Sequence, residues 1–259
     1  PGLGTGAAIA PDGTLWIAGL DDAGHLFVQT RAQGASEWTP RREIDTGSDS
    51  VSADGENRPK IAFGPDRPPT RGIVVITYTH PLSKPYTGEI RLLRSTDGGV
   101  HFAPPITVHQ DRQLITHRFE SIAFDGRGRL HAIWIDKHDQ VAAPKGTPYR
   151  GAAVYRNVSL DGGASFGPDI KLADHSCECC RIALATTAGG DIAALWRHVF
   201  APNIRDHAFA VLGKSDGNPV RASLDEWKFD ACPHHGPGLA AAADGGFHAV
   251  WFGYKEGRP

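Results

Sequence analysis

The sequence predicts an all-β fold, a β-propeller of four-stranded antiparallel blades, and three observations support this. Short apolar runs recur in pairs around Gly or Asp turns, as expected of hairpins. A turn motif ending in an aromatic residue recurs at Trp38, Phe102 and Phe166, each 64 residues apart. The 31 glycines and 19 prolines among 259 residues supply the many turns that such a fold needs.

Each predicted blade begins with a hairpin of two apolar strands. The first strands are short and rich in small residues, which suits the crowded centre of a propeller. They are expected at 7–10, 121–124, 182–185 and 239–242, and the strands that return from them at 130–134, 192–196 and 247–251. Third strands are expected at 89–93, 152–156 and 208–212.

The recurring turn falls between the third and fourth strand of a blade. Its two full copies read Ser-x-Asp-x-Gly-x-x-Phe and span residues 95–102 and 159–166. Weaker copies occupy 31–38 and 214–227. The Asp side chain can accept backbone N–H bonds within the turn, and the aromatic residue can anchor the turn to its own blade. A structural role therefore explains the motif.

This motif resembles the Asp-box (BNR) repeat, and with it the chain resembles the bacterial sialidase-like propellers along nearly its whole length. The resemblance implies a ring that usually has six blades. We expect one propeller domain over 1–259, with about 4.5 blades visible. The expected blades lie at about 1–48, 55–110, 117–173, 180–230 and 235–259, the last being incomplete.

Charge and hydropathy exclude several partners. The formal net charge is −2 and no block of basic residues occurs, so nucleic acid is not an expected partner. No run of 18 apolar residues could form a transmembrane segment. The resemblance implies a periplasmic or secreted bacterial protein, and a chain without Met that starts at Pro1 is compatible with a removed export signal.

The topology of a blade predicts where chemically active side chains gather. In an up-and-down blade the first strand starts, and the second strand ends, on one face of the propeller. Residues at these positions should surround the central mouth, where a metal ion, a glycan or a partner protein could bind. Seven of the 13 histidines and all four cysteines lie at such positions.

Two short segments carry the strongest chemical signal. Cys177-Glu178-Cys179-Cys180 and Cys232-Pro233-His234-His235 precede equivalent first strands. Thiolates and imidazoles favour soft and borderline metals, so a metal site is predicted, with copper as Cu(I) or Cu(II) first and zinc next. Extended backbone would point Cys177 and Cys179 one way. The expected ligands are Cys177, Cys179, Cys180, Cys232, His234 and His235, with His175, His117 and His198 as secondary candidates.

On this basis the leading hypothesis is a metal-binding propeller for copper sequestration, delivery or stress response, rather than an enzyme. One alternative is a non-catalytic glycan- or protein-binding propeller whose cysteines form disulfides, with Cys232 joined to Cys177 or Cys179.

The other alternative is an exo-acting glycoside hydrolase. The resemblance to sialidases implies arginines that bind a substrate carboxylate and a Tyr nucleophile. The residues that could fill these roles are Arg58, Arg118, Arg181 and Tyr254. The Arg-Ile-Pro signature of that family is absent, however, and its nearest match is Arg181-Ile182-Ala183.

Overall fold

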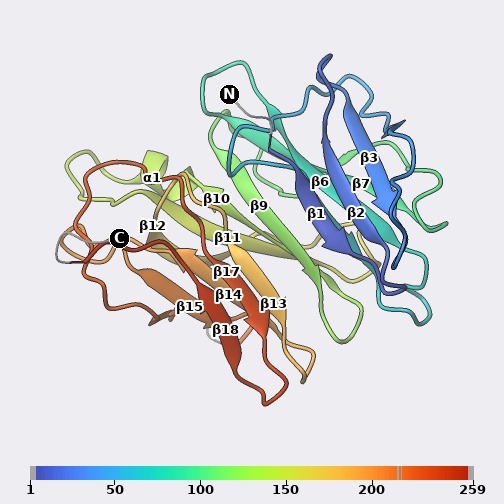
Figure 1. Cartoon of the computed structure of the whole chain (residues 1–259). Coiled ribbons are helices and arrows are strands. Elements are labelled where there is room, and N and C mark those ends of the chain that lie inside the picture. Colours follow the sequence, from blue (N-terminus) through green and yellow to red (C-terminus); the bar gives the residue numbers. More distant parts are fainter. Residues whose placement is uncertain (1–3, 215, 217, 256–259) are drawn as a thin grey trace.

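The computed structural model describes residues 4–214, 216 and 218–255. It is a β-propeller of four antiparallel four-stranded blades, followed by one two-stranded sheet that we call the terminal hairpin (Figure 1). This confirms the predicted fold class, whereas a six-bladed ring stays a prediction. Blade 1 comprises β1 (Gly6–Ile9), β2 (Leu15–Leu20), β3 (Leu26–Arg31) and β4 (Arg42–Glu43). Blade 2 comprises β5 (Lys60–Phe63), β6 (Val74–Pro81), β7 (Gly88–Ser95) and β8 (Ile106–Thr107).

The later blades follow the same plan. Blade 3 comprises β9 (His117–Phe124), β10 (Leu130–Asp136), β11 (Ala152–Ser159) and β12 (Ile170–Ser176). Blade 4 comprises β13 (Ala183–Thr186), β14 (Ile192–Arg197), β15 (His207–Val211) and β16 (Val220–Arg221). The terminal hairpin is β17 (Gly238–Ala241) and β18 (Phe247–Val250).

Strand register defines the two faces of the propeller. In blade 3, His117 at the start of β9 pairs with Asp136 at the end of β10. Leu130 at the start of β10 pairs with Ser159 at the end of β11. We call the end that carries His117 and Asp136 the mouth face, and the end that carries Ser159 the far face.

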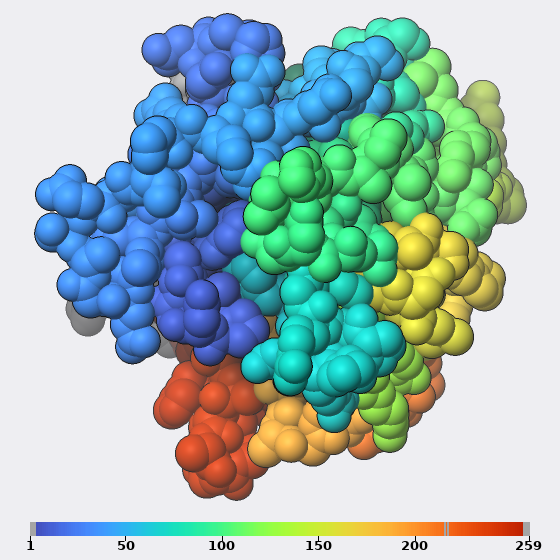
Figure 2. Space-filling view, turned by 90° about the vertical axis from the view of Figure 1, so that its right-hand side faces the viewer, coloured from blue at the N-terminus to red at the C-terminus, as the bar shows by residue number. Residues whose placement is uncertain are grey.

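The first strands are the innermost ones. β5 contacts β1 and β9, and β13 contacts β9 and β17, so they line the centre one after another. Small residues permit this packing: a Cβ on Gly6 would lie 2.0 Å from the carbonyl oxygen of Pro59. In the side-on space-filling view, segments of successive colour follow one another around the molecule (Figure 2).

The hydrophobic core lies between blades rather than within one sheet. One cluster joins blades 1 and 2, a second joins blades 2 and 3, and a third joins blades 3 and 4. Every residue of β10 is buried, because neighbouring blades cover both of its faces. Trp134 and Trp196 are fully buried at these interfaces. A large apolar side chain contributes about 1.5–3 kcal/mol when fully buried, so the interfaces hold the blades in order.

The two full turn motifs have the same hydrogen bonds on the far face. Between β7 and β8, Asp97 accepts from His101 N and Ser95 Oγ accepts from Gly99 N, at 3.0 and 2.8 Å. Between β11 and β12, Asp161 and Ser159 accept the equivalent bonds. The segment 31–38 also connects β3 to β4. In the weak copy at 214–227, Ser215 and Gly217 lie outside the described residues.

One short helix, α1 (His138–Ala142), lies in the connection between β10 and β11. In the described part of the chain, no helix has the length and apolar character required to cross a membrane.

Candidate functional site

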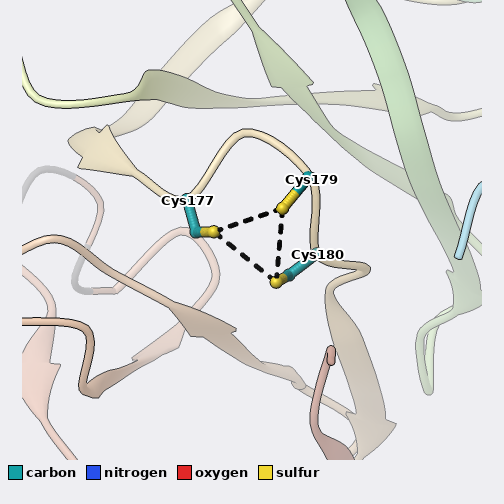
Figure 3. A group of neighbouring side chains, drawn as sticks. All are labelled: Cys177, Cys179 and Cys180. Carbon is teal, nitrogen blue, oxygen red and sulfur yellow. Dashed lines mark hydrogen bonds between the residues drawn. The ribbon is translucent and has the colours of Figure 1, made fainter. Parts of the chain in front are cut away.

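Three of the four cysteines converge within one turn on the mouth face. The turn follows β12, where the Cys177 amide donates to the Arg197 carbonyl at 2.9 Å, and it ends before β13. The sulfur of Cys177 lies 3.7 Å from that of Cys179 and 3.5 Å from that of Cys180, and the last two are 4.0 Å apart (Figure 3). All three side chains are buried. The expected extended backbone is wrong here, because residues 178–180 form a turn. This turn also brings the Cys180 sulfur next to the Cys177 sulfur.

The second segment supplies Cys232 and His234 at the edge of this cluster. Their ligating atoms and the Cys179 sulfur all lie within 4.8 Å of one another. Hydrogen bonds from Cys179 and Cys180 lower the pKa of Cys177 well below its usual value, and the contact with Cys177 raises the pKa of Cys179. The Arg205 guanidinium, 3.5 Å from the Cys177 sulfur, favours the same thiolate.

All four cysteines are free, and all four lie in the described part of the chain. The predicted disulfide between Cys232 and Cys177 or Cys179 is therefore not formed in this structure. Sulfurs 3.5–4.0 Å apart are in contact without being bonded, because a disulfide bond is about 2.05 Å long.

Among the described residues, the remaining predicted histidine ligands share no group of closely spaced ligand atoms with the cysteines. The His235 ring packs on Phe252 at 4.7 Å. His175 accepts a hydrogen bond from the Arg150 amide, and His198 packs on Phe200. Burial, followed by the charge of His175, lowers the pKa of His198 to about 4.

The fully buried His117 joins a second cluster instead. Its Nε2 lies 3.5 Å from Asp111 and 3.7 Å from Asp136, and the His109 ring stacks on its ring at 3.9 Å. Nε2 has no hydrogen-bond partner among the described residues. Burial raises the pKa of Asp136, although the charge of His117 opposes this effect. The His117 ring is thus enclosed by the His109 ring and two carboxylates.

The predicted arginines divide between two cavities. Arg58 and Arg181 line a cavity of about 380 Å³ between the innermost strands. Arg118 lines a second cavity of about 350 Å³ on the mouth face, which we call the mouth cavity. The structure therefore does not bring the three arginines together around one ligand. Tyr254 is exposed and lines neither cavity.

Two of these arginines already bind carboxylates of the chain. Arg118 Nη2 donates to both oxygens of Asp54, at 2.9 and 2.8 Å. Arg181 Nη1 donates to both oxygens of Glu56, at 2.5 and 2.6 Å. A carboxylate ligand would have to displace these partners.

The mouth cavity brings together residues from several loops. Its charged residues are Asp54, Arg118, Lys137 and Glu178, and Lys137 forms an ion pair with Glu178. The strand β9 contributes Arg118 at a β-bulge, where its pairing with β10 shifts register. The remaining lining residues are Tyr86, Thr116, Phe119, Cys179, Cys232 and His234.

The Asp54 carboxylate is held in place by its neighbours. Ser52 Oγ donates to it at 2.7 Å and Asn57 Nδ2 at 3.2 Å. Burial raises the pKa of Asp54, but the hydrogen bonds from Ser52, Arg118 and Asn57 outweigh burial and leave the pKa below its ordinary value. Asp54 is thus a fixed, ionised carboxylate at the cavity wall.

Sequence reasoning missed Asp54, Lys137, Glu178 and Tyr86. A signal was available for Asp54, which precedes the same innermost strand as Asn57 and Arg58. Glu178 stands between two cysteines, so the metal-ligand pattern concealed its carboxylate.

Comparisons with known proteins support the fold. The sequence matches no protein-family profile, and no curated protein matches it. The solved structures similar to this chain include a Penicillium chrysogenum α-L-arabinanase, at 13% identity and a TM-score of 0.64, over 96% of this chain and 74% of that one. An endo-arabinase from Bacteroides thetaiotaomicron is 11% identical with a TM-score of 0.57, over 99% of this chain and 96% of that one.

A third similar structure is the intramolecular trans-sialidase of Ruminococcus gnavus, at 14% identity and a TM-score of 0.53, over 89% of this chain and 46% of that one. At such low identities the similarity shows the fold alone. The expected function in copper sequestration, delivery or stress response is nevertheless wrong, because these neighbours are glycoside hydrolases and sialidases and favour the alternative hypothesis.

Proposed function

We propose that this protein is a glycoside hydrolase that acts at the mouth cavity. The observation that carries the proposal is that two carboxylates, Asp54 and Glu178, line one cavity on the mouth face, each paired with a cation. Most glycoside hydrolases use two carboxylates on either side of the scissile bond. The similarity to arabinanase and trans-sialidase structures adds support at the level of fold.

The surroundings of the two carboxylates suggest different roles. Asp54 is ionised, which suits a nucleophile or a general base. Glu178 is then assigned as the proton donor, and its ion pair with Lys137 must open when substrate binds. Arg118 keeps Asp54 oriented through its two hydrogen bonds.

The same contacts favour an uncharged sugar over a sialic acid. Arg118 and Arg181 each hold a carboxylate of the chain, and the three predicted arginines do not share a cavity. Tyr86 is highly exposed beside the cavity and could stack on a sugar ring. We therefore propose arabinose-containing oligosaccharides, the substrates named for two of the similar structures, as the first class to test.

Two finer assignments belong to this proposal. The far-face turns at 95–102 and 159–166 are taken as Asp-box repeats on the basis of their shared hydrogen bonds. Export to the periplasm or the exterior is proposed because a polysaccharide substrate would lie outside the cell.

The test is hydrolysis of a panel that includes p-nitrophenyl α-L-arabinofuranoside, arabino-oligosaccharides and a fluorogenic sialoside. We expect turnover of an arabinoside, and a fall in kcat/KM of at least about 100-fold in Asp54→Asn and in Glu178→Gln. Asp66→Asn is the matched control, because Asp66 is an exposed carboxylate that also pairs with an arginine. Absence of turnover on the whole panel from pH 4 to 8, or full activity in both variants, would refute the proposal.

A further inference from the structure

The buried Cys179 and the exposed Cys232 line the mouth cavity, and the proposed hydrolysis does not explain the four cysteines of this region. Cys177, Cys179 and Cys180 come from the turn between β12 and β13, while Cys232 comes from the loop before β17. The Cys232 sulfur lies within 4.8 Å of the Cys179 sulfur. Two segments that are distant in sequence therefore bring their thiols close together.

The spacing of the sulfurs matches a tetrahedral metal shell. Zinc binds thiolate sulfur at about 2.3 Å, so two ligands of a regular tetrahedron lie about 3.8 Å apart. The three distances in the turn are 3.5, 3.7 and 4.0 Å (Figure 3). The turn thus already has the arrangement of three zinc ligands, and the Cys232 sulfur, within 4.8 Å of the Cys179 sulfur, needs only a small shift to become the fourth.

The surroundings favour a bound cation over free thiols. The three cysteines of the turn belong to the apolar cluster between blades 3 and 4, packed with residues such as Phe119 and Trp196. Their thiols hydrogen-bond mainly to one another, which is a weak set of contacts for buried polar groups. The Arg205 guanidinium, 3.5 Å from Cys177, would offset part of the negative charge of a thiolate shell.

We propose that Cys177, Cys179, Cys180 and Cys232 bind one zinc ion that clamps the loop before the terminal hairpin to the turn after blade 3. Four thiolates fill the tetrahedral shell and leave no open position, so the ion is structural and takes no part in metal transport or in hydrolysis. Zinc binding would also fix the peptide that carries Glu178. The importance of this effect for catalysis rests on the proposed function.

The test uses the full chain purified under reducing conditions without chelator. We expect about one zinc per chain by elemental analysis, and four thiols that react with Ellman's reagent only after the zinc is removed. Cys232→Ser, at the exposed edge, should lower zinc affinity by at least about 10-fold while the fold is retained by circular dichroism. His235→Ala is the matched control on the same loop, and it should keep the zinc.

Three results would overturn this proposal. The first is four reactive thiols in a protein that takes up no added Zn²⁺. The second is bound copper in place of zinc. The third is an unchanged zinc affinity in Cys232→Ser. None of these measurements uses a substrate. If the protein binds zinc but hydrolyses no substrate, the zinc clamp stands and the proposed function is refuted. If it hydrolyses a substrate but binds no zinc, the proposed function stands and the zinc clamp is refuted.

Discussion

At the scale of the residue, Arg118 controls the charge state of Asp54. The guanidinium is one of three groups that hold the pKa of Asp54 below its ordinary value against the effect of burial. Removing this cation in Arg118→Gln should raise the pKa of Asp54. If ionised Asp54 is required, the acidic limb of the kcat/KM profile moves to higher pH, by about one unit because Asp54 is partly exposed.

The measurement is kcat/KM against pH on the arabinoside that is turned over. Arg71→Gln serves as the control, since Arg71 pairs with the exposed Asp66 and does not line the mouth cavity. An acidic limb that stays in place, or moves to lower pH, would contradict the role given to Asp54.

Individual residues also show where sequence reasoning stopped. The cysteines could be singled out because Cys177 and Cys232 precede equivalent strands in a repeat. Asp54 and Glu178 could not be paired in this way, because they line one cavity only after blades 2 and 3 have packed against each other. The backbone turn at 178–180 also places the Cys180 sulfur against the Cys177 sulfur, and the order of residue types does not reveal this turn.

At the scale of the element, the far-face turns should stabilise blades without affecting chemistry at the mouth. Asp161 accepts bonds from the amides of Ala164 and Ser165 and from the Ser159 hydroxyl. In Asp161→Ala these donors lose their acceptor, so the free energy of unfolding should fall by about 1–2 kcal/mol, with kcat unchanged.

Urea unfolding of Asp161→Ala and Asp12→Ala checks this prediction. Asp12 is an exposed carboxylate in another far-face turn and accepts hydrogen bonds from Thr14, so its loss should cost about 0.5 kcal/mol or less. Equal costs in the two variants, or a fall in kcat for Asp161→Ala, would show that the motif does not act as a local turn.

At the scale of the whole molecule, the sequence is most informative about the order of the blades. Repeated short strands predicted the four-stranded units, and the structure places their strands within a few residues of the expected positions. The contacts that join units were not predictable. Arg94 donates to the Gly162 carbonyl and Arg156 to Asp216, so an arginine of one blade contacts the far-face turn of the next. Such contacts depend on the angle between blades, which no local pattern specifies.

Packing between blades also buries histidines in their neutral form, and this makes the stability of the whole propeller depend on pH. Burial, followed by the charge of His117, lowers the pKa of His109 to about 3, and the pKa of His198 is about 4. In the unfolded chain both should titrate near the ordinary value of about 6.5. Between these limits the unfolded state binds protons that the folded state does not, so stability is complete above about pH 6.5 and declines as the pH falls. At pH 5 the loss is about 2 kcal/mol for each histidine.

Urea unfolding of the reduced, metal-free chain at pH 7.5 and 5.0 tests this prediction. His109→Gln should be less stable than the original chain at pH 7.5, because the ring accepts from the Ile90 amide and donates to the Asp111 carbonyl. Between pH 7.5 and 5.0, His109→Gln should nevertheless lose about 2 kcal/mol less of its free energy of unfolding than the original chain loses. The reason is that the variant lacks the imidazole that takes up a proton on unfolding. His248→Gln removes an exposed histidine and should leave the difference between the two pH values unchanged. If His109→Gln and the original chain lose the same free energy between pH 7.5 and 5.0, neutral burial of His109 between blades 2 and 3 does not make this propeller sensitive to acid.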